Sequence, residues 1–270
     1  MTGIWQSIRG HLFTLWPTAG ECRTVSSSSK SQGGIYELFN FISHLFSSNP
    51  EKKEKRRAEK EERDRLRAQK KHNQRIADKQ VLDDEWHPVN FPYQATIFNI
   101  QRANKGYGST CQISVRYIEN GQYKDMISLV NPKVKSFSFS NYHDIKPEDV
   151  SDAPAFKDVW PKIEPYFSGK NVITYYADAH LRALQATLKK NRLPEPEMHF
   201  IDLYDYFCER HDSWESFSLD FVAEKLGLDS YPSAKHPKAT LDTITEILEL
   251  MYEKRPGILR KLLGVKAKGK

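Results

Sequence analysis

The sequence has 270 residues, a formal net charge of +6 and a mean hydropathy of −0.68, values typical of one folded domain with solvated extensions. It contains no run of about 18 apolar residues, which excludes a membrane-spanning helix, and residues 1–20 make a poor signal peptide. Its three cysteines are far apart and form no C-x-x-C pair, so we expect a cytoplasmic protein without a disulfide or zinc framework.

The net charge is distributed unevenly along the chain. Residues 51–81 hold 13 basic and 7 acidic side chains, whereas residues 254–270 hold 7 basic side chains and none that is acidic. The segment between them, residues 82–253, has a net charge of −8. The sequence therefore predicts an acidic folded body with two basic arms, of which the C-terminal tail is the better contact for an anionic partner.

A helical extension is predicted before the folded body. Residues 1–34 are rich in Ser and lack periodicity, which predicts disorder. Within residues 35–85, the stretch "IYELFNFISHLF" has the spacing of an amphipathic helix, and a highly charged run follows Pro50. This run places Glu four residues before Lys or Arg, as in an exposed helix, and it lacks the apolar heptads of a coiled coil.

Strand and helix patterns alternate within residues 86–253. Three strand-like runs come first, and the "NGQ" that joins the second to the third is a hairpin signal. Helices then alternate with two short strands. This order predicts an α/β domain with a mixed five-stranded sheet flanked by helices, followed by a basic tail over residues 254–270. The three first strands are expected over residues 95–101, 110–117 and 124–130.

Five segments of this domain follow one another in an order that is hard to obtain by chance: "IQRAN…TCQIS", "YHDIKPEDVSDAPAFKDVWPKI", "VITYYADAHLRAL", "FIDLYDYF…SFSLDFVAEKLGL" and "PKATLDTITEIL". Together they resemble the DEDDh 3′–5′ exonucleases, the family of the epsilon subunit of bacterial DNA polymerase III and of RNase T. The resemblance implies an RNase H-like exonuclease fold over residues 86–253.

The family's hydrolysis uses four carboxylates that hold two divalent metals, together with a His that acts as general base. The resemblance places the four carboxylate positions on Asn99, Gln101, His180 and Asp242, and the general base on Pro237. Only Asp242 keeps the family's residue type. Because neutral amides are poor ligands for Mg²⁺, the resemblance implies a degenerate site, a pseudoenzyme, with Mg²⁺ or Mn²⁺ as cofactor only if the site is active.

Neighbouring residues offer weaker hypotheses for this site. His180, His236 and Asp242 are a candidate set for one transition metal, since imidazole suits Zn²⁺ or Mn²⁺. We interpret Asp178 as a helix N-cap rather than as a replacement ligand. We interpret Pro237 as the first residue of a helix, which leaves His236 exposed before it.

Contacts to nucleic acid are expected from two groups of side chains. Tyr142 and Tyr175 are candidates for stacking on bases, although Tyr175 is also a candidate for filling the space left by the metals. The candidate phosphate contacts are the cations of the tail: Arg260, Lys261, Lys266 and Lys268.

The leading interpretation is a nucleic-acid-binding module that holds a single strand or its 3′ end without cleaving it. This interpretation requires no cofactor and no small-molecule substrate. The first alternative is a scaffold that binds a protein partner or an anionic membrane surface through its amphipathic and basic arms. The second alternative is an active metal-dependent 3′–5′ exonuclease.

Overall fold

The computed structural model describes residues 50–77, 79–82 and 85–265. The chain divides into two compact units, residues 1–63 and residues 64–270. No helix in the described part is long and apolar enough to cross a membrane. The predicted disorder of residues 1–34 and the predicted amphipathic helix that follows it lie outside the described residues.

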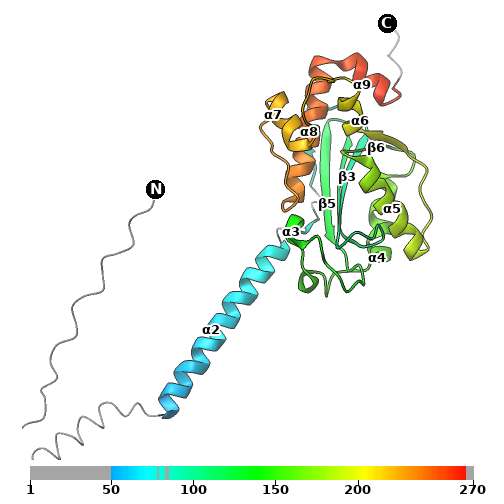
Figure 1. Cartoon of the computed structure of the whole chain (residues 1–270). Coiled ribbons are helices and arrows are strands. Elements are labelled where there is room, and N and C mark those ends of the chain that lie inside the picture. The colour runs from blue at the N-terminus through cyan, green and yellow to red at the C-terminus, as the bar shows by residue number, and fades with distance from the viewer. Residues whose placement is uncertain (1–49, 78, 83–84, 266–270) are drawn as a thin grey trace, which may run out of the picture. The chain divides into compact units, whose positions relative to one another are not determined.

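The described part of the first unit is the beginning of helix α2, which runs from Pro50 to Ala77 (Figure 1). The side chains from Glu51 to Arg63 are all exposed. Arg57 pairs with Glu61 one turn later at 3.0 Å, and such an exposed pair contributes only about 0.3–0.5 kcal/mol. The charged run thus forms the exposed helix that its spacing predicts.

The second unit is built on one mixed sheet with the strand order β1-β5-β4-β3-β6-β7, and β2 also pairs with β5. Strands β3, β4 and β5 form an antiparallel meander, and β6 and β7 continue the sheet in parallel with β3. These five strands are the ones that the sequence predicts, and the two-residue strands β1 and β2 add to the β5 edge. The strands are β1 Val81–Leu82, β2 His87–Pro88, β3 Ala95–Arg102, β4 Thr110–Glu119, β5 Gln122–Leu129, β6 Asn171–Thr174 and β7 His199–Asp202.

The hairpin between β4 and β5 fixes the register of these two strands. It turns at Asn120 and Gly121, whose φ angles of 53° and 74° lie in the left-handed region. A two-residue hairpin turn requires such angles, and Asn and Gly adopt them at the lowest cost. In the neighbouring pair of strands, Asn99 of β3 lies opposite Ser114 of β4, so that these two side chains share one face of the sheet.

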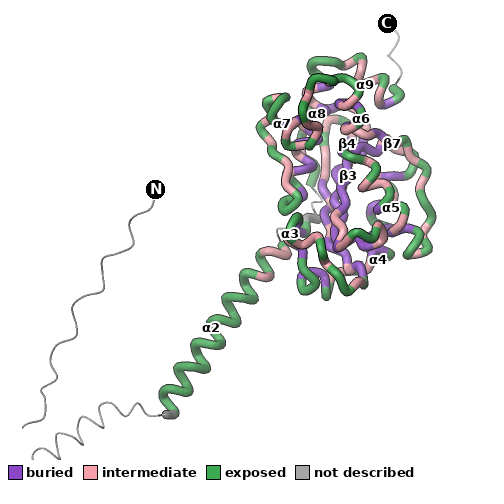
Figure 2. Tube along the Cα trace, in the orientation of Figure 1, coloured by how far each residue is buried: buried purple, intermediate pink, exposed green. Residues whose placement is uncertain are grey.

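Helices cover both faces of the sheet, and the buried residues are concentrated in the strands between them (Figure 2). On one face, Ile97 of β3 belongs to a core cluster with Leu241 of α8. On the other face, Phe98 belongs to a second cluster with Phe156 of α4 and Leu184 of α5. The helices of this unit are α3 Ser140–His143, η1 Pro147–Asp149, α4 Phe156–Ile163, η2 Glu164–Tyr166, α5 Ala177–Asn191, α6 Leu203–Cys208, α7 Leu219–Leu226, α8 Pro237–Lys254 and α9 Pro256–Leu262.

Helix α9 lies in the segment that the sequence analysis treats as a basic tail. Its Leu259 is fully buried and the following Leu263 is 3% exposed, and both belong to the cluster under α8. The apolar residues of "GILRKLLG" alternate with basic ones at helical spacing, so the segment buries one face and exposes its charges on the other. The folded unit therefore continues past residue 253.

The last turns of α2, which belong to the second unit, are fixed by polar contacts. Arg75 forms an ion pair with the buried carboxylate of Asp149, and His72 Nδ1 lies 3.6 Å from the same carboxylate. Lys79 Nζ donates to the carbonyl of His143 at 2.8 Å. The C-terminal end of this charged helix is thus held by hydrogen-bonded charges, the form in which buried charges are tolerated, and by Ile76, which packs on a small buried apolar cluster.

Candidate functional site

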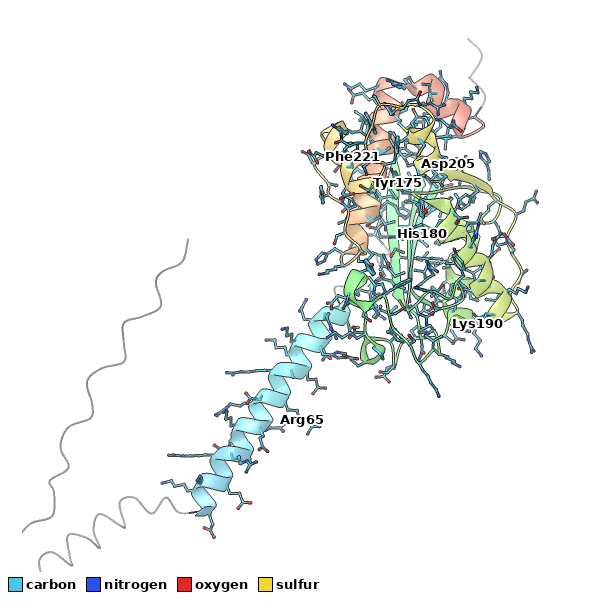
Figure 3. All side chains as sticks on the ribbon, in the orientation of Figure 1. Arg65, Tyr175, His180, Lys190, Asp205 and Phe221 are labelled. Atoms are coloured by element: carbon cyan, nitrogen blue, oxygen red, sulfur yellow. The ribbon has the colours of Figure 1, made fainter. Side chains whose placement is uncertain are left out.

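Strand β3 directs Asn99 and Gln101 toward the face that α8 covers, because side chains two residues apart share a face. Both side chains line a cavity of about 350 Å³. His180 of α5 and Tyr175 at the end of β6 lie close together in this part of the unit (Figure 3). The other residues that line the cavity are Thr174, Leu219, Asp220, Tyr231, Pro232, Ser233, Ala234, Thr240 and Ile244.

Asn99 is a buried amide with an unused acceptor. The residue is 7% exposed, and its Oδ1 has no hydrogen-bond partner among the described residues. A buried polar atom without a partner costs about 1–3 kcal/mol. A ligand that donates a hydrogen bond into this cavity would recover that free energy.

His180 is held as a neutral imidazole. Its Nδ1 accepts a hydrogen bond from the backbone N–H of Ile100 at 3.2 Å, which leaves the proton on Nε2. Burial, and then the positive charge of Arg102, lower the pKa of His180 to about 4. At neutral pH this side chain therefore presents a weak N–H donor and no charge.

Asp242, the one retained carboxylate, is paired with a buried arginine. Arg116 Nη2 donates to Asp242 Oδ1 at 2.7 Å, and the same guanidinium forms two bonds of 2.7 Å to Asp125. Arg116 also donates to Thr245 Oγ1 at 3.0 Å. Burial alone would lower the pKa of Arg116, but the two carboxylates outweigh it and raise that pKa. The charge of Asp242 is thus compensated inside the protein.

Pro237 and His236 take the positions that their structural interpretation predicts. Pro237 is the buried first residue of α8, and His236 precedes it as an exposed residue. Neither lines the cavity beside Asn99.

The residues at this site do not fit the two divalent metals that the family resemblance implies. Mg²⁺ requires hard, charged oxygen ligands, whereas the polar groups of the cavity include two amides, an imidazole whose Nδ1 already accepts a bond, and Asp220 as the one carboxylate among the described residues that line it. The weaker candidate set of His180, His236 and Asp242 does not assemble either: among the residues that the structure describes, no three His, Cys, Asp or Glu side chains are grouped to hold one metal ion.

The two tyrosines that the sequence singles out differ in exposure. Tyr175 is 7% exposed, and its hydroxyl donates to the carbonyl of Phe217 at 2.5 Å. Its ring lines the cavity without an open face, so it fills space there, and the prediction that it stacks on a base is not supported by its burial. The neighbouring Tyr176 is 50% exposed, and Tyr231 on the facing loop is 60% exposed. Tyr231 lines the cavity, whereas Tyr176 follows Tyr175 in the chain and is not among the residues that line it.

Tyr142 is 70% exposed and lines a second cavity of about 340 Å³. Arg102 also lines it, with its guanidinium 4.5 Å from the centre of the Tyr107 ring and 5.5 Å from that of Phe139. The two cavities share Gln101 and His180 in their linings. A ligand in the cavity beside Asn99 would therefore lie next to a surface formed by the cation Arg102 and by aromatic side chains.

The expected N-cap role of Asp178 is wrong. Helix α5 begins after Tyr176, and Asp178 lies in its first turn, where it pairs with Arg182 at 2.6 Å. Asp202 at the end of β7 caps the helix instead, because its carboxylate accepts from the backbone N–H groups of Tyr176 and Ala177 at 2.9 and 2.7 Å. A cap from a distant strand leaves no local sequence signal.

The cations of the C-terminal segment are divided between described and undescribed residues. Arg260 is half-buried and Lys261 is exposed on α9. Lys266 and Lys268 lie outside the described residues. None of the four lines the two cavities beside His180 in the described part of the chain.

Sequence reasoning missed Arg116, Arg102, Tyr231 and Asp202. The signal for Arg116 was present, because a charged residue in the middle of the apolar run "ISVRYI" must face either solvent or a partner charge. Arg116 lies two residues after Ser114 on the same strand, so the two side chains share a face, and Ser114 is paired with Asn99. Tyr231 lies in a loop whose path no periodic pattern reveals.

Comparison with known proteins identifies one family. The family model described as RNase_T, Exonuclease, matches residues 104–249. The match begins after Asn99 and Gln101 and includes His180, Pro237 and Asp242. A search of curated protein sequences gave no match.

Solved exonuclease structures share the fold, each at a TM-score of 0.52. The cell-death related nuclease 4 (CRN-4) is 16% identical, and the match covers 62% of this chain and 66% of that one. The nuclease domain of 3'hExo, a DEDDh family member bound to rAMP, is 14% identical, with 67% and 99% covered. Exonuclease I of E. coli in complex with a dT13 oligonucleotide is 11% identical, with 62% and 43% covered. The predicted RNase H-like exonuclease fold is thereby confirmed.

Proposed function

Because this chain belongs to the RNase_T exonuclease family, we propose that it is a catalytically inactive member that binds the 3′ end of a single nucleic-acid strand in the cavity beside Asn99. The observation that carries this proposal is the ion pair between Arg116 and Asp242. A guanidinium there compensates the charge that would otherwise attract a divalent cation.

Loss of hydrolysis follows from the chemistry of the remaining side chains. In active members, bound metals supply an activated water and stabilise the leaving oxygen. Here Asn99 and Gln101 carry no charge with which to hold a metal, and Pro237 has no proton-accepting group. His180 is a poor substitute for the missing base, since a pKa of about 4 lies far below the neutral range in which a general base is effective.

Retention of binding is supported by the cavity itself. Asn99 and Gln101 carry no charge that would repel a phosphate, so Asp220 is the one carboxylate among the described residues that line the cavity. The unused Oδ1 of Asn99 suits a hydroxyl or amine donor of a terminal nucleotide. The open rings of Tyr176 and Tyr231 suit base stacking. Members of the fold have been crystallised with rAMP and with dT13 and dA16 oligonucleotides.

We predict that the full chain binds short single-stranded DNA or RNA but does not shorten it in Mg²⁺ or Mn²⁺. Fluorescence anisotropy measures binding, and gel electrophoresis of an end-labelled strand measures cleavage. Replacing Tyr176 and Tyr231 by Ala should weaken binding roughly tenfold or more, because each stacked base contributes about 1–3 kcal/mol. The matched replacements by Phe should keep most of the affinity.

Two results would contradict this proposal. Metal-dependent shortening of the strand that Asp242→Ala abolishes would show an active exonuclease. The absence of binding to every single strand tested would remove the nucleic-acid function and favour the interpretation as a scaffold.

We further propose that the basic C-terminal segment supplies much of the electrostatic affinity. Its seven cations should be replaced by Gln rather than deleted, because Leu259 and Leu263 belong to the core. The slope of log affinity against log salt should then decrease by up to about 5, since each phosphate neutralised on a single strand contributes about 0.7. Replacing seven cations of α2 instead is the matched control, and an equal decrease in that variant would assign the contact to non-specific charge. The residues replaced in the tail are Lys254, Arg255, Arg260, Lys261, Lys266, Lys268 and Lys270.

A further inference from the structure

A strongly basic cavity lies at the C-terminal end of α5, away from the site at the beginning of that helix. Its volume is about 260 Å³. Lys190 marks this end of α5 and His180 the other (Figure 3), and ten residues of helix separate them by about 15 Å. Of the described residues that line the cavity, none is acidic and four are cations: Lys133, Lys157, Lys190 and Arg192.

The charges of these four cations are not compensated. None of them forms an ion pair with a described residue. Lys190 Nζ donates to the carbonyls of Gly108 and Pro132 at 3.0 and 2.8 Å, which hold the ammonium in place without neutralising it. Residues 82–253 carry a net charge of −8, so an uncompensated positive cluster within them produces a strong local attraction for anions.

Two of the cations occupy backbone positions that favour glycine. Lys133 has a φ of 50° and Arg192 a φ of 57°, and a residue with a side chain costs roughly 1 kcal/mol in this left-handed region. The loop at Lys133 is fixed by Asn131, whose Oδ1 accepts from the Lys133 N–H at 2.9 Å and whose Nδ2 donates to the carbonyl of Ser151 at 3.1 Å. The structure thus holds cations in place where glycine would fold more easily.

Side chains, rather than helix ends, determine the charge of this cavity. The N-terminal end of α4 and the C-terminal end of α5 both contribute to its lining, and their dipoles have opposite sign there. The last carbonyls of α5 are also occupied, because Arg192 N–H bonds to the carbonyls of Leu188 and Lys189. What remains is a set of exposed ammonium and guanidinium groups.

Further cations lie between the basic cavity and the site. Tyr107, next to the Gly108 that lines the basic cavity, has the guanidinium of Arg102 4.5 Å and that of Arg182 5.9 Å from its ring centre. Arg102 also lines the cavity shared with His180. Arg182 is partly neutralised by Asp178, whereas Arg102 forms no ion pair within the described residues. A polyanion that leaves the site along α5 therefore meets cations before it reaches Lys190.

We propose that the basic cavity binds the phosphodiester backbone of a nucleic-acid strand whose 3′ end occupies the cavity beside Asn99, several nucleotides upstream of that end. The proposal rests on the proposed nucleic-acid function. It adds a second contact between protein and strand, and it makes the strand run along α5 from the site to the basic cavity. The cations spread over a loop and two helices, which suits an extended polyanion better than a single small phosphate.

The test replaces Lys133, Lys157 and Arg192 by Gln in the full chain and keeps Lys190, because its ammonium holds two backbone carbonyls. Anisotropy is measured with a single strand of about 16 nucleotides, the upper end of reported single-strand site sizes, and with a labelled dinucleotide, which is too short to span the length of α5 between the two cavities. Binding of the longer strand should weaken, and its salt slope should decrease by about 2, since three phosphate contacts contribute about 0.7 each. Binding of the shorter strand should not change.

The matched control removes three exposed lysines that line none of the described cavities: Lys146, Lys162 and Lys225. This variant has the same net charge as the first, so an equal loss in both would overturn the proposal. If the wild-type chain binds both strands and the first variant binds them equally well, the proposal for the basic cavity is overturned and the proposed function stays intact. Failure of the wild-type chain to bind any strand would instead refute the proposed function itself.

A second pair of variants separates binding from folding. Lys133→Gly and Arg192→Gly relieve the left-handed backbone, so the Tm should stay the same or rise while the longer strand binds less tightly.

A titration with inorganic pyrophosphate tests whether the basic cavity binds a small anion instead. Tight pyrophosphate binding that depends on these cations, without any dependence on strand length, would assign the cavity to a small anion and overturn the polyanion proposal.

Discussion

Replacement of Arg116 by Met is expected to lower the free energy of unfolding by about 3–5 kcal/mol. Arg116 is 1% exposed and Asp125 is fully buried, so the substitution leaves a carboxylate in the core without its two hydrogen bonds. Removing one partner of a buried pair costs more than the pair contributes, since the remaining charge is uncompensated. Urea unfolding followed by circular dichroism measures the change.

Two control variants locate the origin of this loss. Asp242→Asn should cost much less, because the Asp242 side chain is 35% exposed and Arg116 keeps its bonds to Asp125. Combining Arg116→Met with Asp125→Asn should recover part of the loss by removing the stranded charge. A change below about 1 kcal/mol for Arg116→Met, the size typical of an exposed ion pair, would contradict the buried triad.

Acidification is expected to destabilise the fold through His180. Its pKa is about 4 in the folded chain against an ordinary value of 6.5, so the unfolded chain takes up a proton first as the pH falls. The stability that His180 contributes is therefore complete above pH 6.5 and is lost progressively as the pH falls to 4. The difference between these two values corresponds to about 3 kcal/mol.

Denaturant unfolding at several pH values between 4 and 7 measures this effect. His180→Gln should flatten the dependence, whereas His236→Gln, which changes an exposed side chain, should leave it unchanged. Burial also lowers the pKa of His143, so a smaller dependence of the same sign should persist in the His180 variant. An identical pH profile for wild type and His180→Gln would show that the imidazole is not buried as described.

Local patterns predicted most of the fold. The strands and the turn at Asn120 and Gly121 follow from side-chain alternation and from left-handed backbone preference, so they need no long-range information. The same holds for α8, whose first residue Pro237 has a conformation suited to a helix start. Helix α9 was missed because its basic residues dominate the composition, although its leucines have helical spacing.

The sequence predicted where the site lies, but it did not predict which side chains form ion pairs and hydrogen bonds there. The register of β3 and the resemblance to a known family bring Asn99, Gln101 and His180 to one cavity. No spacing rule connects Arg116 to Asp242, which are 126 residues apart in the sequence. The burial of Tyr175 likewise depends on a loop carbonyl, that of Phe217. Contacts between distant segments determine these details, and a single sequence does not record them.

The double pairing of Arg116 also links the candidate site to the core. A mutation that restores one carboxylate at Asn99 or Gln101 yields no metal site, because Asp242 stays bound to the guanidinium. A mutation that removes Arg116 first leaves Asp125 stranded in the core and destabilises the fold. On the proposal that the chain is inactive, no single substitution among these residues is therefore expected to assemble a metal site. The bonds of Arg116 to Asp125 and Asp242 therefore couple the chemistry available at the site to the stability of the core.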